Sequence, residues 1–373
     1  MLRSLFALLL FAHGLIHAVG FLKQWNLASI SQLSGKSFIT LSDEASKLSG
    51  ILWLLTCLGF FVTMVGCLIN REWWSGVGLV SVLMSQSLII VYWTDARAGT
   101  FANIIIAMVL VLVYAHDRFE KQADQEVLQL LKQPVVVPGV ITREMLHDLP
   151  APVQEWMLAS GVVGKERVHT VRLQQHGLMR TSPDGKWMPT EAKQYFAVDR
   201  PGFVWEADVH MLPFLPLAGR DKYADGKGNM LIKALSLVPV VNASDAKTDQ
   251  GTLLRYLGEL CWFPSAALSP YITWQAIDST HAQATMTYQG VSATAVFAFD
   301  EQHRLVNVSA NRYMGGGKEG KLEKWYIPVR AWKEMDGVTI PVKGDVIWRL
   351  PTGDFDYYQW EITDIDYNRP ELY

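Results

Sequence analysis

Two histidines four residues apart, His13 and His17, lie in an otherwise apolar run near the N-terminus. Side chains at this spacing share one face of a helix, where imidazoles can bind a metal, contact a haem edge or carry a proton. Polar residues inside a membrane helix are functional candidates by default. The alternative is packing or hydrogen bonding between helices, with Gln86 and Asn103 as partners. We favour this alternative because haem ligation usually needs histidines on facing helices.

A second pair with chemical potential is Arg255 and Glu259, which lie four residues apart in a segment with helical periodicity. Side chains at this spacing can form a simple ion pair on the helix surface, and this is the interpretation that we favour. A helix that lies on a sheet hides one face, however. Either residue can therefore be the polar anchor of a ligand pocket instead, together with Asp221 or Arg312.

The residues Asp221, Tyr223 and Asp225, followed by Gly226, imitate the start of a calcium-binding loop. Such a loop carries oxygen donors at alternate positions before the glycine that allows its sharp turn. The twelfth position must supply a bidentate carboxylate, and here it is Ile232. The calcium interpretation fails, so we predict a hairpin turn with exposed carboxylates.

The glycine-rich segment at residues 315–321 (GGGKEGK) has the glycine and lysine spacing of a phosphate-binding loop. The next residue is Leu322, where a serine or threonine should hold magnesium, and residues 325–332 have the pattern of a strand. A hairpin loop is the better interpretation. The sequence also contains no nucleophile elbow, paired-cysteine motif or HExxH motif, so we predict no catalytic residue, metal site or cofactor.

Composition excludes two further classes of protein. The chain has 373 residues and a formal net charge of −3, and no basic stripe of the kind that marks a nucleic-acid-binding surface. Cys57 and Cys67 lie ten residues apart in one apolar segment, about 15 Å along a helix, which excludes a disulfide between them. With Cys261 as the third cysteine, neither a disulfide framework nor a cysteine-based zinc site is available.

Four uncharged apolar runs are long enough to span a bilayer, which requires about 20 residues. They cover residues 4–22, 48–70, 75–94 and 98–115. We therefore predict a multi-pass protein of the cell membrane, which is the inner membrane in a Gram-negative cell. The first run can alternatively be a secretory signal, since Arg3 precedes it and residues 18–20 offer a cleavage site. The positively charged residues are balanced between the two sides, so the side of the soluble part stays open.

The elements that position these motifs can be predicted from the periodicity of the sequence. We predict a four-helix transmembrane domain at residues 1–118, a charged helical linker at 119–139 and a soluble β-rich domain at 140–373. From residue 168 the pattern alternates with a period of two, interrupted by turn signals such as Asp225-Gly226, Gln289-Gly290 and Asp336-Gly337. Roughly ten strands follow from this spacing.

One helix interrupts the predicted strands at residues 247–262. Its apolar face carries Leu253, Leu257 and Leu260, Asp245 or Asp249 can cap it, and Pro264 can end it. The fold class is therefore membrane α plus soluble α+β, with a curved antiparallel sheet wrapped against the inserted helix. Such a sheet often encloses an apolar pocket, and we expect Leu257 or Leu260 to line it.

The chain resembles a known family in several segments. Residues 220–228 (RDKYADGKG) and 254–264 (LRYLGELCWFP), with Trp274 and Asp278, resemble the signature of an uncharacterised bacterial family defined by a domain of unknown function. The N-terminal HGLIH and GILW sequences are similar to the four-helix membrane part of its longer members. The resemblance implies no known activity. It implies a soluble domain similar to the curved sheet of the outer-membrane lipoprotein carriers, which hold acyl chains between sheet and helix.

We therefore predict an integral membrane protein that contacts the lipid bilayer and whose β domain binds a hydrophobic or amphiphilic, lipid-like ligand. One alternative is a membrane-bound enzyme with Asp221, Glu259 or Arg312 in its chemistry, and another is a structural or signalling module that binds a protein. An apolar cavity favours the carrier, and convergent carboxylates in a cleft favour the enzyme. The candidate ligand-binding residues are Asp221, Tyr223, Arg255, Glu259, Trp262, Trp274 and Arg312.

Overall fold

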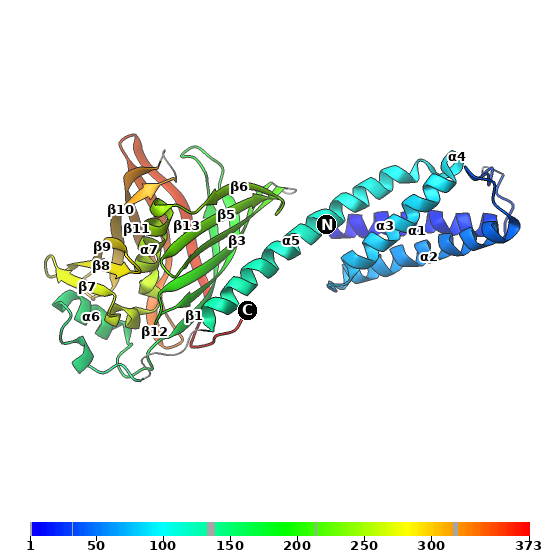
Figure 1. Ribbon diagram of the computed structural model, residues 1–373. Helices are drawn as coiled ribbons and strands as arrows, with labels where there is room; N and C mark the ends of the chain where they lie inside the picture. Colours follow the sequence, from blue (N-terminus) through cyan, green and yellow to red (C-terminus); the bar gives the residue numbers. More distant parts are fainter. Residues whose placement is uncertain (1, 32, 133–138, 213–214, 316–319) are drawn as a thin grey trace. The chain divides into compact units, whose positions relative to one another are not determined.

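The chain forms two compact units, residues 1–117 and 118–373. They are seen in a computed structural model that describes all residues except 1, 32, 133–138, 213–214 and 316–319 (Figure 1). Each unit packs around residues of its own.

The first unit consists of helices. Four of them are long and apolar enough to cross a membrane, and they confirm the apolar runs that the sequence indicates. The helices are α1 (Leu2–Gln24), α2 (Asp43–Leu68), α3 (Trp74–Val91), the short α4 (Trp93–Ala96) and α5 (Gly99–Leu131). Helix α5 continues without a break through the charged residues that follow the fourth apolar run. No proline or glycine lies between Thr100 and Leu131 to interrupt it.

The second unit is built around one antiparallel sheet of thirteen strands, curved as Figure 1 shows. Its strands are β1 (Thr170–Met179), β2 (Met188–Ala197), β3 (Gly202–Leu212), β4 (Leu215–Ala224), β5 (Lys227–Ala234), β6 (Val238–Ala243), β7 (Ile272–Ala276), β8 (His281–Tyr288), β9 (Val291–Phe299), β10 (Leu305–Met314), β11 (Lys321–Met335), β12 (Val338–Leu350) and β13 (Gly353–Tyr367). They pair in the order β6-β5-β4-β3-β2-β1-β13-β12-β11-β10-β9-β8-β7. The predicted fold class is thereby confirmed.

The expected count of about ten strands was too low because some turns carry no turn signal. The predicted turns Asp225-Gly226 and Asp336-Gly337 do connect hairpins, and both residues of each pair have positive φ angles. The turn between β5 and β6 is formed by Leu235 and Ser236, which also have positive φ angles of 53° and 56°. Neither residue type predicts a left-handed conformation.

Helix α7 (Ala246–Glu259) is the inserted helix. Of the two expected caps it is Asp245 that serves, since its side chain accepts a hydrogen bond from Thr248 N at 2.8 Å. Two 3-10 turns follow the helix, η2 (Leu260–Trp262) and η3 (Pro264–Leu268). Pro264 is therefore the first residue of η3, and the helix has already ended at Glu259. Before the sheet lie η1 (Glu144–Leu146) and α6 (Ala151–Ser160). Helix α7 packs on β4, β5, β8, β9 and β10, inside the curve of the sheet.

The leucines of α7 and the first residue of η2 form part of the main hydrophobic core. Leu253, Leu254, Leu257 and Leu260 are each 0% exposed and pack with rings such as Phe196. Alternation along β2 and β3 turns the next side chains, among them Tyr195 and Val204, to the opposite face of the sheet. There they pack against the last turns of α5, where Val127 is also fully buried. The sheet is thus covered on both faces in this region.

Candidate functional site

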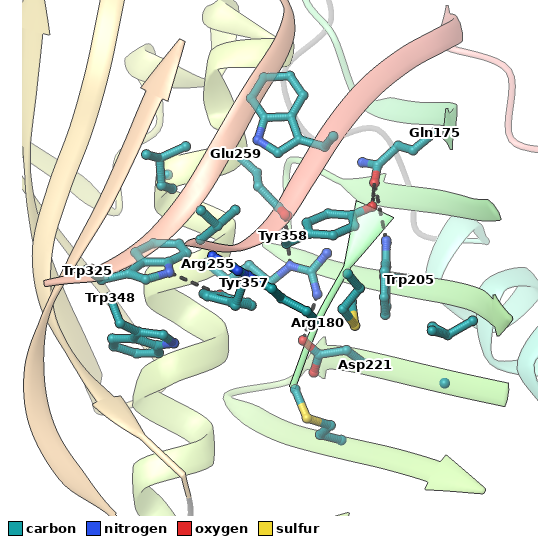
Figure 2. Close-up of a pocket in the computed structure, with 18 of the residues that line it drawn as sticks. Gln175, Arg180, Trp205, Asp221, Arg255, Glu259, Trp325, Trp348, Tyr357 and Tyr358 are labelled. Atoms are coloured by element: carbon teal, nitrogen blue, oxygen red, sulfur yellow. Dashed lines mark hydrogen bonds and ion pairs between the residues drawn. The ribbon is translucent and has the colours of Figure 1, made fainter. Parts of the chain in front are cut away.

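A cavity of about 400 Å³ lies between α7 and the curved sheet (Figure 2). Strands from both halves of the sheet contribute to its wall, as do α7 and η2. Most of the lining side chains are aromatic or aliphatic: Met179, Met188, Trp205, Val209, Leu217, Met230, Ile232, Trp262, Trp325, Ile327, Val346, Trp348, Phe355, Tyr357, Tyr358 and Trp360. A wall of this composition suits an apolar molecule.

The polar part of the wall is centred on Arg255 of α7. Its Nη1 donates to Asp221 Oδ2 and its Nε donates to Glu259 Oε1, both at 2.8 Å. The guanidinium also stacks on Trp205, 4.8 Å from the ring centroid, and on Phe203 at 5.1 Å. Figure 2 shows Asp221 and Glu259 converging on this group from β4 and from α7. One arginine therefore pairs with two carboxylates in the cavity wall.

Two glutamines on the sheet hold this ion-pair cluster in place. Gln194 Nε2 donates to Glu259 Oε2 at 2.7 Å, and Gln175 Nε2 donates to Gln194 Oε1 at 3.2 Å. Trp205 Nε1 and the Tyr358 hydroxyl both donate to Gln175 Oε1, at 3.4 and 3.2 Å. A chain of bonds of this kind fixes each member's orientation, because an unpaired polar group would be costly in so buried a place.

Burial shifts the pKa values of two groups in and beside the cluster. It raises the pKa of Glu259, although Arg255 opposes the shift. Glu259 therefore holds a proton more readily than an exposed glutamate does. Burial also raises the pKa of the Cys261 thiol, which lines the same cavity. A thiol kept protonated in this way is a poor nucleophile.

Two polar atoms of the cavity wall have no hydrogen-bond partner among the described residues. They are Asp221 Oδ1, an acceptor, and Trp262 Nε1, a donor. The two residues are only 1% and 4% exposed. Both atoms are almost wholly covered by neighbouring groups, so they are unpaired buried atoms behind the cavity surface and not groups that face its open space.

The structure gathers five of the seven candidate ligand-binding residues around this cavity. The five are Asp221, Arg255, Glu259, Trp262 and Arg312. Two expectations about them need correction. The Arg255–Glu259 pair is not on the surface, since the two side chains are 14% and 13% exposed, and Asp221 is a buried carboxylate although we expected an exposed one. Burial is possible because the cluster joins two elements: Asp221 on β4 pairs with Arg255 on α7, which also pairs with Glu259.

The other two candidates pack elsewhere. Tyr223 is fully buried in the main core, with its ring 6.4 Å from that of Tyr288. Trp274 donates its Nε1 to the carbonyl of Ala267 at 3.0 Å and packs edge-on against Phe297. Neither residue lines the cavity.

Sequence reasoning missed Gln194 and Gln175, which orient the cluster. A signal for Gln194 exists, since it alternates with Ala192 and Phe196 on the core-facing side of β2. A polar residue at a core position of a strand needs a buried partner. The prediction that Leu257 or Leu260 lines the pocket is wrong. The neighbouring residues Gly258 and Cys261 line the cavity instead.

The histidine pair of the first unit lies in a separate hydrogen-bond network. His13 Nε2 is 2.9 Å from Asn103 Oδ1 on α5, and His17 Nε2 is 2.8 Å from Ser85 Oγ on α3. Asn103 also donates to Gln86 Oε1 at 3.0 Å. The arrangement links α1, α3 and α5, as expected for hydrogen bonding between helices.

The glycine-rich segment at residues 315–321 lies mostly outside the described residues, which omit 316–319. The chain after it forms strand β11 and no helix. Phosphate-binding loops are followed by a helix whose N-terminus helps to bind the anion, so this observation speaks against such a loop.

Comparison with known proteins gives one family and several remote structural likenesses. No curated protein matches the chain. Among solved structures, a domain from Vibrio parahaemolyticus named for outer membrane lipoprotein sorting has 9% identity and a TM-score of 0.35, covering 58% of this chain and 91% of that one. A LolA superfamily protein from Nitrosomonas europaea has 8% identity and a TM-score of 0.33, covering 58% and 94%. A DUF1329 family protein from Desulfovibrio piger has 10% identity and a TM-score of 0.34, covering 58% and 92%.

Each of these likenesses is remote in both sequence identity and TM-score. The match to a family is of another kind, since it spans residues 139–360 and so most of the β domain with its cavity. The chain belongs to this family, which is described as a family of unknown function, DUF6544.

Proposed function

We propose that the β domain binds an amphiphilic, lipid-like molecule in the cavity between α7 and the sheet. The observation that carries this proposal is the cavity itself, about 400 Å³ in volume and walled mainly by aromatic and aliphatic side chains. Sites for small molecules commonly have volumes of about 300–1,000 Å³, apolar walls and few polar groups.

The polar groups of the wall support an amphiphile over a pure hydrocarbon. Gln175, Arg180, Arg255 and Arg312 all contribute side chains to the wall. Polar groups of this kind must keep their hydration or find a hydrogen-bond partner, and a pure hydrocarbon supplies none. A ligand with one polar end and an apolar chain matches both the polar and the apolar parts of the wall.

The four apolar helices support a lipid as the source of that ligand. We place the chain in the cell membrane as a multi-pass protein, so that a domain carried on the same polypeptide stays close to lipid. Tethering of this kind raises the effective concentration of a membrane-derived ligand around its binding site.

The groups of the cavity favour binding over catalysis. The carboxylates of Asp221 and Glu259 both face Arg255, and a general base must be free to take a proton. The thiol of Cys261 is kept protonated by burial. None of these groups is therefore prepared for general-base or nucleophilic chemistry.

Photolabelling of the full-length protein in detergent micelles tests the proposal. The probe is a long-chain fatty acid with a diazirine on its chain, and labelled peptides are mapped by mass spectrometry. We expect labelled peptides from the lining strands, such as β3, β4 and β11. Labels confined to residues 1–117 would contradict the proposal.

A cavity-filling variant, Gly258→Leu, sharpens the test. A Cβ atom at Gly258 would lie 3.6 Å from Trp325 and 3.7 Å from Ile327, which is ordinary contact, and the rest of the side chain would occupy the cavity. Leucine also favours the helix more than glycine does. We expect Gly258→Leu to abolish labelling of the lining strands. The matched control Ala246→Leu, an exposed position of the same helix, should leave the labelling unchanged.

A further inference from the structure

One charged residue of the cavity wall is not accounted for by the ion-pair cluster. Arg312, on β10, is half-buried and lines the cavity. Its guanidinium lies 4.8 Å from the ring centroid of Trp325 and 6.0 Å from that of Trp348, and its Nε donates to the carbonyl of Gly251 at 3.2 Å. Two indole rings and one main-chain bond therefore hold the group in place, because arginine stacks well on aromatic faces.

No carboxylate of the described residues forms an ion pair with Arg312, whereas Arg255 and Arg220 in the same wall both have one. Arg255 faces Asp221 and Glu259, and Arg220 faces Glu126 at 3.0 Å. Glu323 is directly opposite Arg312 on β11, and the two side chains form no ion pair. The terminal nitrogens of Arg312 have no hydrogen-bond partner among the described residues either.

A charge in this position needs a counter-charge once the cavity is filled. When an apolar chain displaces water from the wall, an unpaired guanidinium loses hydration without compensation. A carboxylate or phosphate on the ligand restores the balance. Such a group can accept two parallel hydrogen bonds from the terminal nitrogens, in the geometry that arginine forms best.

A second arginine of the wall strengthens the positive character of this part of the cavity. Arg180 packs on Trp187, 4.5 Å from the ring centroid, and donates to the main-chain oxygens of Asp356 and Pro183. It has no carboxylate partner among the residues that the structure describes. The net charge left over in the wall is therefore positive, since the two carboxylates of the wall already face Arg255.

We infer that the amphiphile carries an anionic group and that Arg312 binds this group. The inference rests on the proposed function and names its ligand class: a single acyl chain ending in a carboxylate or a phosphate. Arg312 bonds the main chain of Gly251, one helical turn before Arg255, so the anion lies next to a cluster whose two carboxylates already pair with Arg255. The cavity thus selects for acidic over uncharged amphiphiles.

The test compares three photolabels of equal chain length on the full-length protein in detergent. They are a diazirine fatty acid, the corresponding fatty alcohol and a lysophosphatidic acid with the same chain. We expect the two anionic probes to label the lining strands at about tenfold lower concentration than the alcohol does, because the guanidinium is only half-buried and water partly screens its charge-assisted hydrogen bonds. The stronger of the two anionic probes then identifies a carboxylate or a phosphate as the preferred group.

Variants of Arg312 assign the effect to this residue. Arg312→Gln should remove the tenfold preference while labelling by the alcohol persists, and Arg312→Lys should keep part of it. The control is Arg349→Gln, because Arg349 is exposed, stacks on Tyr326 and does not line the cavity. It should preserve the preference.

The outcomes separate this inference from the proposed function. Equal labelling of the lining strands by acid and alcohol, or an unchanged preference in Arg312→Gln, would overturn the anionic class and leave ligand binding intact. Absence of labels in the lining strands with all three probes would overturn both.

Discussion

The ion-pair cluster in the cavity wall should dominate the stability of this part of the β domain. The change Arg255→Gln removes the guanidinium that faces Asp221 and Glu259, whose side chains are 1% and 13% exposed. Removing one partner of a buried ion pair typically costs about 3–5 kcal/mol, because the remaining charge stays uncompensated. We expect a loss at the lower end, about 3 kcal/mol, since Glu259 can take up a proton and so escape part of the penalty.

The loss should depend on pH, and its sign follows from the direction of the shift. Burial raises the pKa of Glu259 above the ordinary value of about 4.3. The folded state then holds a proton that the unfolded state releases, so stability is highest below the ordinary pKa and falls as pH rises through the folded pKa. Arg255 limits this shift. Its removal should raise the pKa further, and Arg255→Gln should therefore lose less stability at pH 5 than at pH 8.

The measurement is urea unfolding of the full-length protein in detergent, followed by hydrogen exchange in peptides from β4 and α7. Because hydrogen exchange is measured peptide by peptide, the signal of β4 and α7 is separated from that of the apolar helices. The control is Arg369→Gln: Arg369 is 60% exposed, and its partner Asp366 keeps a second ion pair with Arg172, so a loss below about 1 kcal/mol is expected. If Arg255→Gln lost no more than this control, or lost equally at both pH values, the cluster would not be the buried, coupled unit described above.

Three further predictions concern other parts of the β domain. Leu257→Ala should lower the free energy of unfolding by about 2–5 kcal/mol while fatty-acid labelling persists, because this leucine lies in the filled core. Burial, with nearby carboxylates, raises the pKa of Glu206 to about 8. The free energy of unfolding should therefore fall as pH rises from about 4.3 to 8. In urea unfolding, Glu206→Gln should show a smaller dependence of this free energy on pH. A fragment of residues 118–373 should be soluble without detergent by size-exclusion chromatography. Residues 133–373 should aggregate or melt lower, because they lack the end of α5 and its Glu126.

The membrane part of the fold could be predicted because its signal is local. An apolar run of about 20 residues meets the thickness of a bilayer whatever the rest of the chain does. Hairpins that turn on glycine were equally accessible, as at Gly226 and Gly337. The turn at Leu235 and Ser236 was not, because there the strand pairing of β5 and β6 imposes a conformation that neither residue prefers.

The ion-pair cluster could be predicted only in part. The spacing of Arg255 and Glu259 on one helix indicates that they can pair, and they do. Their burial depends on Asp221, which lies 34 residues away in sequence, and on Gln194, which lies 61 residues away. Sequence spacing on a helix carries no information about partners on strands, so the pair resembled an ordinary surface interaction.

The faces of α7 show why the cavity wall itself was misplaced. Amphipathic periodicity identifies the apolar face of a helix, and it was right that Leu253 and Leu257 are buried. It treats the opposite face as exposed, although on α7 that face, with Arg255 and Gly258, is buried as well and lines the cavity. A helix inside a curved sheet has neighbours on both sides, and its charged side chains can be buried when the strands supply counter-charges. The charged face of such a helix is therefore the place to look for the ligand site, and its apolar face the place to look for the core.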